Sequence, residues 1–133
     1  MAVRVAMTTL VVDDYDRGIA FYRDALGLAL IADTDLGGGK RWVVLGAAAG
    51  ARLLLAKADG ERQRAAIGNQ TGGRVGFFLE TDDFARDHAD FITRGVTFRE
   101  APRYEAYGTV AVFEDPFGNG WDLIEPKTLG DMT

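Results

Sequence analysis

The chain has no cysteine and one histidine among its 133 residues. Disulfides, thiolate metal sites and cysteine nucleophiles are therefore excluded, as is any site that needs two histidines from one chain. Apolar runs are also short, since the longest spans residues 43–51, well below the roughly 18 residues of a membrane-spanning helix. The N-terminus lacks the apolar core of a secretory signal. These absences predict a cytoplasmic protein that does not bind membranes.

Basic charge is scarce as well. The formal net charge is −5, whereas nucleic-acid backbones and anionic surfaces are bound by basic faces. We therefore expect no nucleic-acid partner. The content of 47% hydrophobic and 26% charged residues is that of an ordinary globular protein, and the length fits one domain with its own core.

The pattern of apolar residues predicts the order strand, helix, three strands, given twice. Both expected helices follow an aspartate pair, Asp13-Asp14 and Asp82-Asp83, which is typical of N-caps, and both are followed by a glycine. His88 falls on the apolar stripe of the second helix, where it is expected to pack rather than react. The expected strands are residues 3–12, 28–32, 41–45, 52–56, 74–81, 96–100, 110–113 and 121–124.

One constant spacing aligns the two halves. Moving 69 positions along the chain takes Asp13-Asp14 to Asp82-Asp83, Gly39 to Gly108, Val44 to Phe113, and Leu54-Leu55 to Leu123-Ile124. An internal duplication is the natural reading. It predicts one module over residues 3–57, a connector over 58–73 with a short helix near 61–67, and a second module over 74–126, all within a single domain of residues 1–133.

Two segments resemble the vicinal oxygen chelate superfamily: the aspartate-capped helix of residues 14–28 and the turn Asp115-Pro116-Phe117-Gly118-Asn119. This superfamily includes glyoxalase I, extradiol dioxygenases, fosfomycin-resistance enzymes and bleomycin-resistance proteins. The resemblance covers residues 3–126. It implies an α+β fold in which two tandem βαβββ modules form a curved mixed sheet around a cleft, with the helices on the outer face. It also implies a homodimer.

Metal enzymes of this superfamily carry ligands on the first and last strands of each module. The resemblance places these positions at Met7, Leu53, Gly76 and Asp122. Leucine and glycine offer no side-chain ligand, and a thioether is too soft for Mg²⁺ or Mn²⁺, so we expect no metal and no other cofactor. The alternative is a metal-dependent enzyme, a glyoxalase-like lyase or an extradiol-type dioxygenase, with ligands from other positions.

Asp122 is a carboxylate within an otherwise apolar strand. In a cleft, desolvation would raise its pKa and suit it to contact a ligand, or more weakly to act as a general acid or base. The alternatives are an ion pair with Arg52 or Arg74, or solvent at the rim. The residues expected to line the cleft are Met7, Thr9, Trp42, Leu53, Gly76, Phe78, Tyr107, Phe113 and Asp122. For each aromatic residue, the alternative is a place in the core.

The sequence thus predicts a metal-free protein of the glyoxalase and bleomycin-resistance type that binds a small, partly apolar molecule. Its role would be sequestration or a divergent reaction without metal. The metal-dependent enzyme remains one alternative, and a non-catalytic scaffold or regulatory module whose cleft is filled by side chains is the other.

Overall fold

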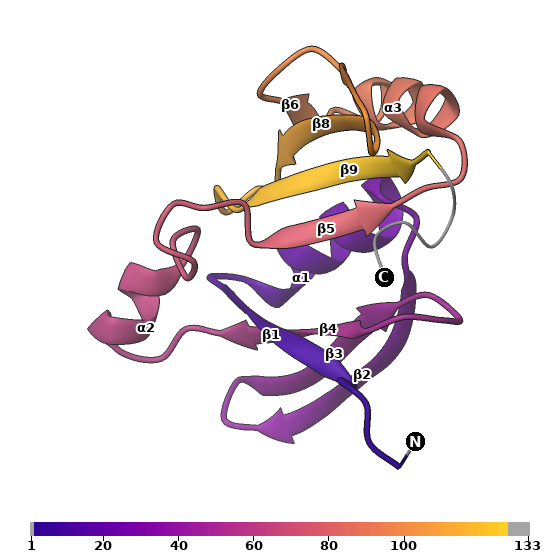
Figure 1. Ribbon diagram of the computed structural model, residues 1–133. Helices are drawn as coiled ribbons and strands as arrows, with labels where there is room; N and C mark the ends of the chain where they lie inside the picture. Colours follow the sequence, from indigo (N-terminus) through magenta and orange to yellow (C-terminus); the bar gives the residue numbers. More distant parts are fainter. Residues whose placement is uncertain (1, 128–133) are drawn as a thin grey trace. The chain divides into compact units, whose positions relative to one another are not determined.

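The computed structural model describes residues 2–127 (Figure 1). The chain divides into two compact units, Met1–Gly68 and Asn69–Thr133, and the boundary lies within the predicted connector. None of the helices in residues 2–127 is long and apolar enough to cross a membrane. The elements in chain order are β1 (Met7–Val12), α1 (Tyr15–Ile19), η1 (Ala20–Ala25), β2 (Ala29–Gly37), β3 (Lys40–Gly46), β4 (Arg52–Lys57), α2 (Glu61–Ala66), β5 (Phe77–Glu80), α3 (Phe84–Thr93), β6 (Thr97–Phe98), β7 (Arg103–Glu105), β8 (Gly108–Glu114) and β9 (Gly120–Pro126).

The first unit is a four-stranded sheet in the order β1-β4-β3-β2, in which β1 and β4 are parallel and the other pairs are antiparallel. One sheet face packs against α1, and its residues Leu10, Val43, Leu45 and Leu55 are at most 1% exposed. Because side chains alternate along a strand, the residues between them lie on the face that α1 does not cover.

The helical segment of the first unit begins with the predicted cap. The Asp14 side chain accepts a hydrogen bond from the backbone N–H of Arg17 at 3.1 Å. After Ile19 the helix widens into η1, a π-helical segment in which the N–H of Leu26 donates to the carbonyl of Phe21, five residues earlier. A π turn accommodates one more residue than an α turn of the same helix. The segment therefore contains an extra residue before Gly27 ends it.

The second unit repeats this plan. Its sheet has the order β5-β9-β8-β6, with β7 also paired to β8, and β5 is parallel to β9 (Figure 1). Helix α3 covers one face, where Phe91 meets Phe113 with ring centroids 5.8 Å apart. The predicted α+β class with two βαβββ modules is confirmed.

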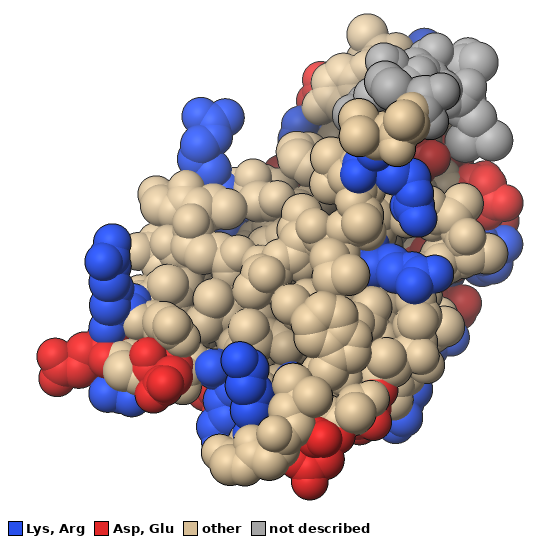
Figure 2. All heavy atoms as spheres, turned by 90° about the horizontal axis from the view of Figure 1, so that it is seen from below, with Lys and Arg blue, Asp and Glu red and all other residues tan. Residues whose placement is uncertain are grey.

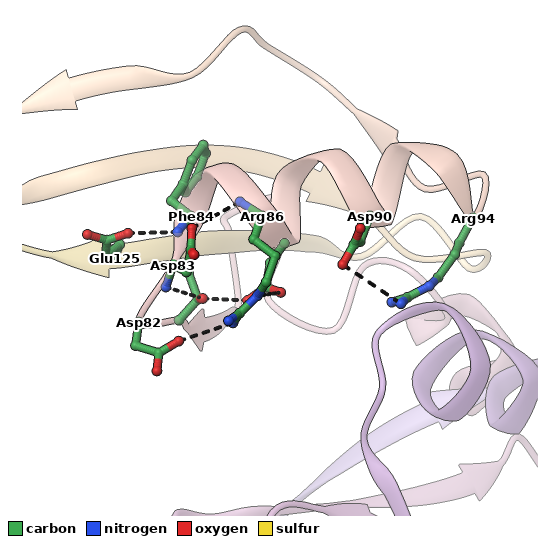
Figure 3. A network of polar contacts seen from close by, with 9 residues as sticks. Asp82, Asp83, Phe84, Arg86, Asp90, Arg94 and Glu125 are labelled. Atoms are coloured by element: carbon green, nitrogen blue, oxygen red, sulfur yellow. Dashed lines mark hydrogen bonds and ion pairs between the residues drawn. The ribbon is translucent and has the colours of Figure 1, made fainter.

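Polar side chains hold the start of α3 against the sheet (Figure 3). Asp83 accepts from the N–H of Arg86 at 3.1 Å, which confirms the predicted cap. Glu125 on β9 accepts from the N–H of Phe84 at 2.7 Å, a second cap supplied from 41 residues away. An ion pair between Arg86 and Asp82 at 3.1 Å lies at the same helix end. The acidic pair therefore serves the helix N-terminus, where carboxylates interact favourably with the helix dipole.

Several strand boundaries differ from the sequence predictions. β1 starts at Met7 rather than at residue 3, and β2 continues to Gly37, five residues beyond the expected strand over residues 28–32. β7 and the first residues of β8 lie between the expected strands over residues 96–100 and 110–113. In each case strand pairing across the sheet decides the outcome, and a residue pattern along one strand does not record its partner.

The two modules align with two spacings rather than one. The first residues of α1 and α3, Tyr15 and Phe84, are 69 positions apart (84 minus 15). The first residues of β4 and β9, Arg52 and Gly120, are 68 apart (120 minus 52), as are those of β3 and β8. The helix-ending glycines, Gly27 and Gly95, already show the shorter spacing (95 minus 27). The change therefore falls within the helices, where η1 contains the extra residue.

Candidate functional site

The uncovered face of the second sheet carries an exposed aromatic ring beside a carboxylate. Strand register places Phe78, Asp122 and Val112 side by side on β5, β9 and β8. Directly paired residues of neighbouring strands project to the same face. The Phe78 side chain is 60% exposed, whereas Phe113 and Trp121, on the opposite face, are at most 3% exposed. The sheet thus separates a sealed core from an open apolar surface.

Asp122 lies in the middle of this open surface with an unsatisfied oxygen. Its Oδ1 atom is buried and has no hydrogen-bond partner within residues 2–127. Loss of solvent raises the pKa of the carboxyl group above its usual value, Arg103 opposes this change, and Glu100 adds to it. The predicted direction of the pKa shift is confirmed. The predicted alternative of an ion pair with Arg52 or Arg74 does not appear among the ion pairs of the described chain.

Arg103 is held in place by carboxylates other than Asp122. Its Nε donates to Glu100 at 2.9 Å, and its Nη1 donates to Glu105 at 3.1 Å. Side-chain hydrogen bonds raise the pKa of the Arg103 guanidinium, with the largest effect from Glu100, a smaller one from Tyr107 and the smallest from Glu105. The second oxygen of Glu100 accepts from the N–H of Val112 at 2.9 Å, which fixes Glu100 beside the strand that pairs with Asp122. Arg103 therefore influences Asp122 through space without donating to it.

Removal of the Asp122 charge should stabilise the protein in a pH-dependent way. Because the folded-state pKa is raised, the contribution of the carboxyl group is most favourable below its unfolded-state pKa and is lost as the pH rises through the folded-state pKa. We expect Asp122→Asn to increase the free energy of unfolding at pH 7 by up to about 1 kcal/mol. This is the low end of the range for an unsatisfied buried polar group, because solvent screens the exposed part of the carboxyl group. Urea unfolding at pH 7 and at pH 3.5 measures the difference, which should vanish at the lower pH. An equal gain at both values would contradict this origin.

The uncovered face of the first sheet is apolar. The register places Thr9 beside Leu54 and Leu54 beside Val44. Met7 and Trp42, two positions before Thr9 and Val44 on their own strands, lie on the same face. Trp42 pairs with Thr34 of β2, and its side chain is 41% exposed. Met7, Thr9 and Trp42 are therefore brought to one face, as the sequence predicted.

Two of the predicted lining residues lie on the other side of their sheets. Leu53 is 8% exposed and belongs to the face that α1 covers, while Phe113 is fully buried and contacts Phe91 of α3. Neither shares a face with the predicted set. The cause is the spacing of 68 in the last strands, because an error of one residue moves a strand side chain to the opposite face. The equivalent residues on the open faces are Leu54 and Val112.

The side chains at the superfamily's metal positions do not fit a divalent ion. Leu54, the open-face equivalent of Asp122, has no donor atom in its side chain, its neighbour Leu53 lies on the face that α1 covers, and Gly76 has no side chain. A Cβ atom at Gly76 would lie 2.4 Å from Cγ2 of Thr71, so Thr71 occupies the space that a ligand side chain would need. Within residues 2–127, no group of three or more His, Asp or Glu residues is arranged to hold a metal. No reaction step through a metal can be derived from these residues.

An open hollow also exists at the tip of the β2–β3 hairpin, lined by Asp33, Asp35, the glycines 37–39 and Arg41. Arg41 is the cation of this hollow. Its guanidinium is paired with Asp33 at 2.8 Å and with Asp16 at 2.9 Å, and Tyr15 lies under it. These contacts neutralise the cation and make it a poor anion receptor.

His88, which was expected to pack on its helix, and Tyr107, which was expected to line the cleft, remain to be placed. The His88 ring packs on Phe84 at 5.3 Å and on Phe98 at 4.5 Å, so the imidazole belongs to the α3 side of the sheet, as its place on the helix stripe indicated. Tyr107 is 45% exposed and lies close to Arg103. Glu100 and Arg103 escaped the sequence analysis because Glu100 ends an expected strand and Arg103 lies in the segment between two expected strands. The one available signal was an Arg flanked by carboxylates.

Comparisons with known proteins agree with this architecture. Residues 4–123 match the model of the Glyoxalase/Bleomycin resistance protein/Dioxygenase superfamily, and the chain belongs to this superfamily. A relative from Shewanella frigidimarina (strain NCIMB 400), described as an uncharacterized protein, is 47% identical over 128 residues, which cover 94% of this chain and 95% of the relative.

Two similar solved structures place the fold among proteins that include an antibiotic binder. UcmS2 is 28% identical with a TM-score of 0.80, covering 93% of this chain and 98% of its own. TnmS3, described as an antibiotic binding protein from Streptomyces sp. CB03234, is 29% identical with a TM-score of 0.76, covering 96% of this chain and 99% of its own.

Proposed function

We propose that this protein binds a small, partly apolar molecule without a metal ion and sequesters it. The observation that carries the proposal is the pair formed by Phe78 and Asp122 on the uncovered face of the second unit. The aromatic residue is 60% exposed, and the carboxylate oxygen beside it is buried and has no hydrogen-bond partner among the described residues. The surface can therefore make both apolar and polar contacts with a ligand. Ligand sites commonly combine an apolar lining with a few placed polar groups.

The energetics of both groups favour this reading. Each Å² of exposed aromatic surface that a ligand covers contributes roughly 25 cal/mol to the binding free energy. A buried acceptor without a donor costs about 1–3 kcal/mol. A ligand that covers Phe78 and donates to the Asp122 carboxyl group would recover part of both quantities. TnmS3, which has the same fold and is described as antibiotic binding, gives a precedent for binding by this architecture.

The alternatives have weaker support. A metal-dependent lyase or dioxygenase would need donors that Leu54 and Gly76 do not supply. A scaffold filled by its own side chains does not match the exposure of Phe78 and Trp42. A metal-independent reaction is favoured by one observation, the raised pKa of Asp122, which suits a general acid. The structure offers no second catalytic group in hydrogen-bond contact with Asp122 among the described residues.

The setting of this activity is part of the proposal. A homodimer follows from the superfamily's common assembly, and a cytoplasmic location and the lack of nucleic-acid partners follow from the composition. On the face drawn in Figure 2, Lys and Arg side chains stand as separate groups, mainly around the edge of a largely uncharged surface. This face does not offer the continuous basic stripe that a nucleic-acid backbone requires.

Naphthalen-1-ylmethanol, a neutral bicyclic alcohol, is a suitable probe. In ¹H–¹⁵N correlation spectra of the chelator-treated protein, we expect titration with this probe to shift the amide signals of β5 and β9. Phe78→Ala should weaken the binding about tenfold, the upper range for loss of an aromatic contact, because the open face loses its main apolar surface. Mass spectrometry should recover the probe unchanged.

Ile92 supplies the matched control. It is 52% exposed on α3, away from the open face, so Ile92→Ala removes an equally exposed apolar side chain and should leave binding intact. Binding that survives Phe78→Ala, or that disappears with Ile92→Ala, contradicts the proposed site. Binding that requires an added divalent ion contradicts the metal-free mode.

A further inference from the structure

The polar contact at Asp122 specifies the charge of the ligand. Resting on the function proposed above, we infer that the molecule bound beside Phe78 carries a protonated amine, which the Asp122 carboxylate receives. The ligand class is therefore an aromatic or otherwise apolar amine, as opposed to a neutral or an anionic molecule of the same shape.

The first step is that no protein donor within residues 2–127 satisfies Asp122. Oδ1 is buried and unpartnered. Arg103, the cation that lowers the pKa of Asp122, donates hydrogen bonds to Glu100 and Glu105. Redirecting the guanidinium would leave those carboxylates without their charge-assisted bonds, which are among the stronger protein hydrogen bonds. A donor for Asp122 must therefore come from outside the described chain.

The second step is the balance of charge on this face. Among the residues of β5 to β9 and of the segment between β6 and β7, five carboxylates and two guanidinium groups lie on this face or at its border. The acidic members are Glu80 on β5, Glu100, Glu105 on β7, Glu114 on β8 and Asp122 on β9, and the basic members are Arg99 and Arg103. Arg99 is itself held by Glu114 at 3.1 Å and by the carbonyl of Gly118 at 3.1 Å.

Both guanidinium groups are thus already paired, and the excess charge of the face is negative. An anionic ligand would meet repulsion and would add a second unpaired charge beside Asp122. A neutral donor could bond to the carboxyl group but would leave its charge uncompensated. A cationic donor supplies both the hydrogen bond and the compensating charge. Hydrogen bonds to charged groups contribute about 1.5–3 kcal/mol, against about 0.5–1.5 kcal/mol for bonds between neutral groups. The charge balance therefore selects the cation.

The third step is the distance between the polar and apolar contacts. Phe78 and Asp122 are direct neighbours on adjacent strands, which lie roughly 4.8 Å apart. A ring stacked on Phe78 therefore reaches the carboxyl group with an amine one or two bonds from the ring. The ring of Phe78 also offers its own face to a nearby cation. This spacing suits a short arylalkylamine unit within a larger ligand.

The test compares three probes with the same bicyclic ring: 1-naphthylmethylamine, naphthalen-1-ylmethanol and 1-naphthoate. We expect the amine, a cation at pH 7, to bind at least tenfold tighter than the alcohol and the anion to bind more weakly than either, as measured by amide shifts of β5 and β9. Asp122→Asn should weaken the binding of the amine about tenfold while the binding of the alcohol changes less than twofold.

Glu80→Gln is the control for general electrostatic attraction. Glu80 lies on the same face and is exposed, and Glu80→Gln removes its charge without changing the shape of the side chain. This variant should bind the amine within about twofold of the wild-type affinity. The amine affinity should also fall as the pH is lowered and the Asp122 carboxylate takes up its proton, in the wild type and not in Asp122→Asn. Folding of each variant is checked by its thermal melting curve.

The outcomes separate this inference from the proposed function. Equal binding of amine and alcohol, or an equal loss of amine affinity in Asp122→Asn and Glu80→Gln, overturns the inference and leaves the proposed apolar site standing. Binding of none of the three probes to the β5–β9 face overturns both. Selective binding of the amine that depends on Asp122 alone supports both.

Discussion

Phe113→Ala is expected to lower the free energy of unfolding by about 3–5 kcal/mol, the range for removal of a fully buried phenylalanine ring. Phe113 is 0% exposed, and its ring centroid lies 5.8 Å from that of Phe91, 5.6 Å from Phe98 and 6.0 Å from Trp121. A cavity at this point would separate α3 from the sheet. Urea unfolding followed by circular dichroism measures the loss.

Phe78→Ala is the matched comparison, because it removes the same side chain from the other face of the same sheet. Since the Phe78 ring is 60% exposed, its loss should change stability by no more than about 0.5–1 kcal/mol. Ligand binding should show the reverse order, with Phe78→Ala the damaging change. If Phe113→Ala proves as mild as Phe78→Ala, the assignment of the two faces is wrong.

Gly108→Ala is expected to destabilise the protein by roughly 3 kcal/mol or more. Its φ of +154° lies in a region that is nearly restricted to glycine, and a Cβ atom would lie 2.3 Å from the Glu125 carbonyl oxygen and 3.0 Å from Cα of Pro126. Both neighbours are backbone atoms of β9, so relief requires the start of the β8–β9 ladder to separate. Thermal unfolding of the purified variant measures the effect.

Gly39 offers a control for backbone conformation alone. Its φ is +82°, but a Cβ atom there would meet nothing within 4 Å. Gly39→Ala should therefore cost only about 1–2 kcal/mol, the price of a left-handed alanine. Equal losses in Gly39→Ala and Gly108→Ala would show that the close approach of β9 contributes nothing.

The residues at the superfamily's metal positions bear on the proposed binding without a metal. The fold is kept over residues 4–123, yet most of these positions offer no side-chain donor for a hard metal ion. One of them, Asp122, remains as a single carboxylate whose buried oxygen has no partner. Conservation of a fold with replacement of its site residues is common, since function depends on the site rather than on the architecture.

Local signals in the sequence were sufficient for the order of elements, the caps and the family. Asp14 and Asp83 cap their helices because a side-chain oxygen three residues before an N–H needs only local geometry to bond to it. Gly27 and Gly95 adopt positive φ at the helix ends for an equally local reason. The short helix α2 was expected near residues 61–67 and is found at Glu61–Ala66. None of these features depends on a distant partner.

The faces of the last strands required the folded chain. A single spacing of 69 assigned Leu53 and Phe113 to the open faces, while the structure places Leu54 and Val112 there. The difference of one residue arises in η1, a π-helical widening that no residue pattern in the sequence revealed. Because strand side chains alternate, a spacing wrong by one residue exchanges core for surface wherever a strand position is assigned from its counterpart in the other module.

The chemical state of Asp122 also depends on distant partners. The sequence showed a carboxylate in an apolar strand and allowed several roles for it. Its raised pKa comes from loss of solvent, moderated by Arg103 and reinforced by Glu100, two residues that lie about twenty positions earlier in the chain and reach Asp122 only through the β7–β8–β9 pairing. Burial and electrostatic environment are properties of packing in three dimensions, so they follow from strand register and not from residue order.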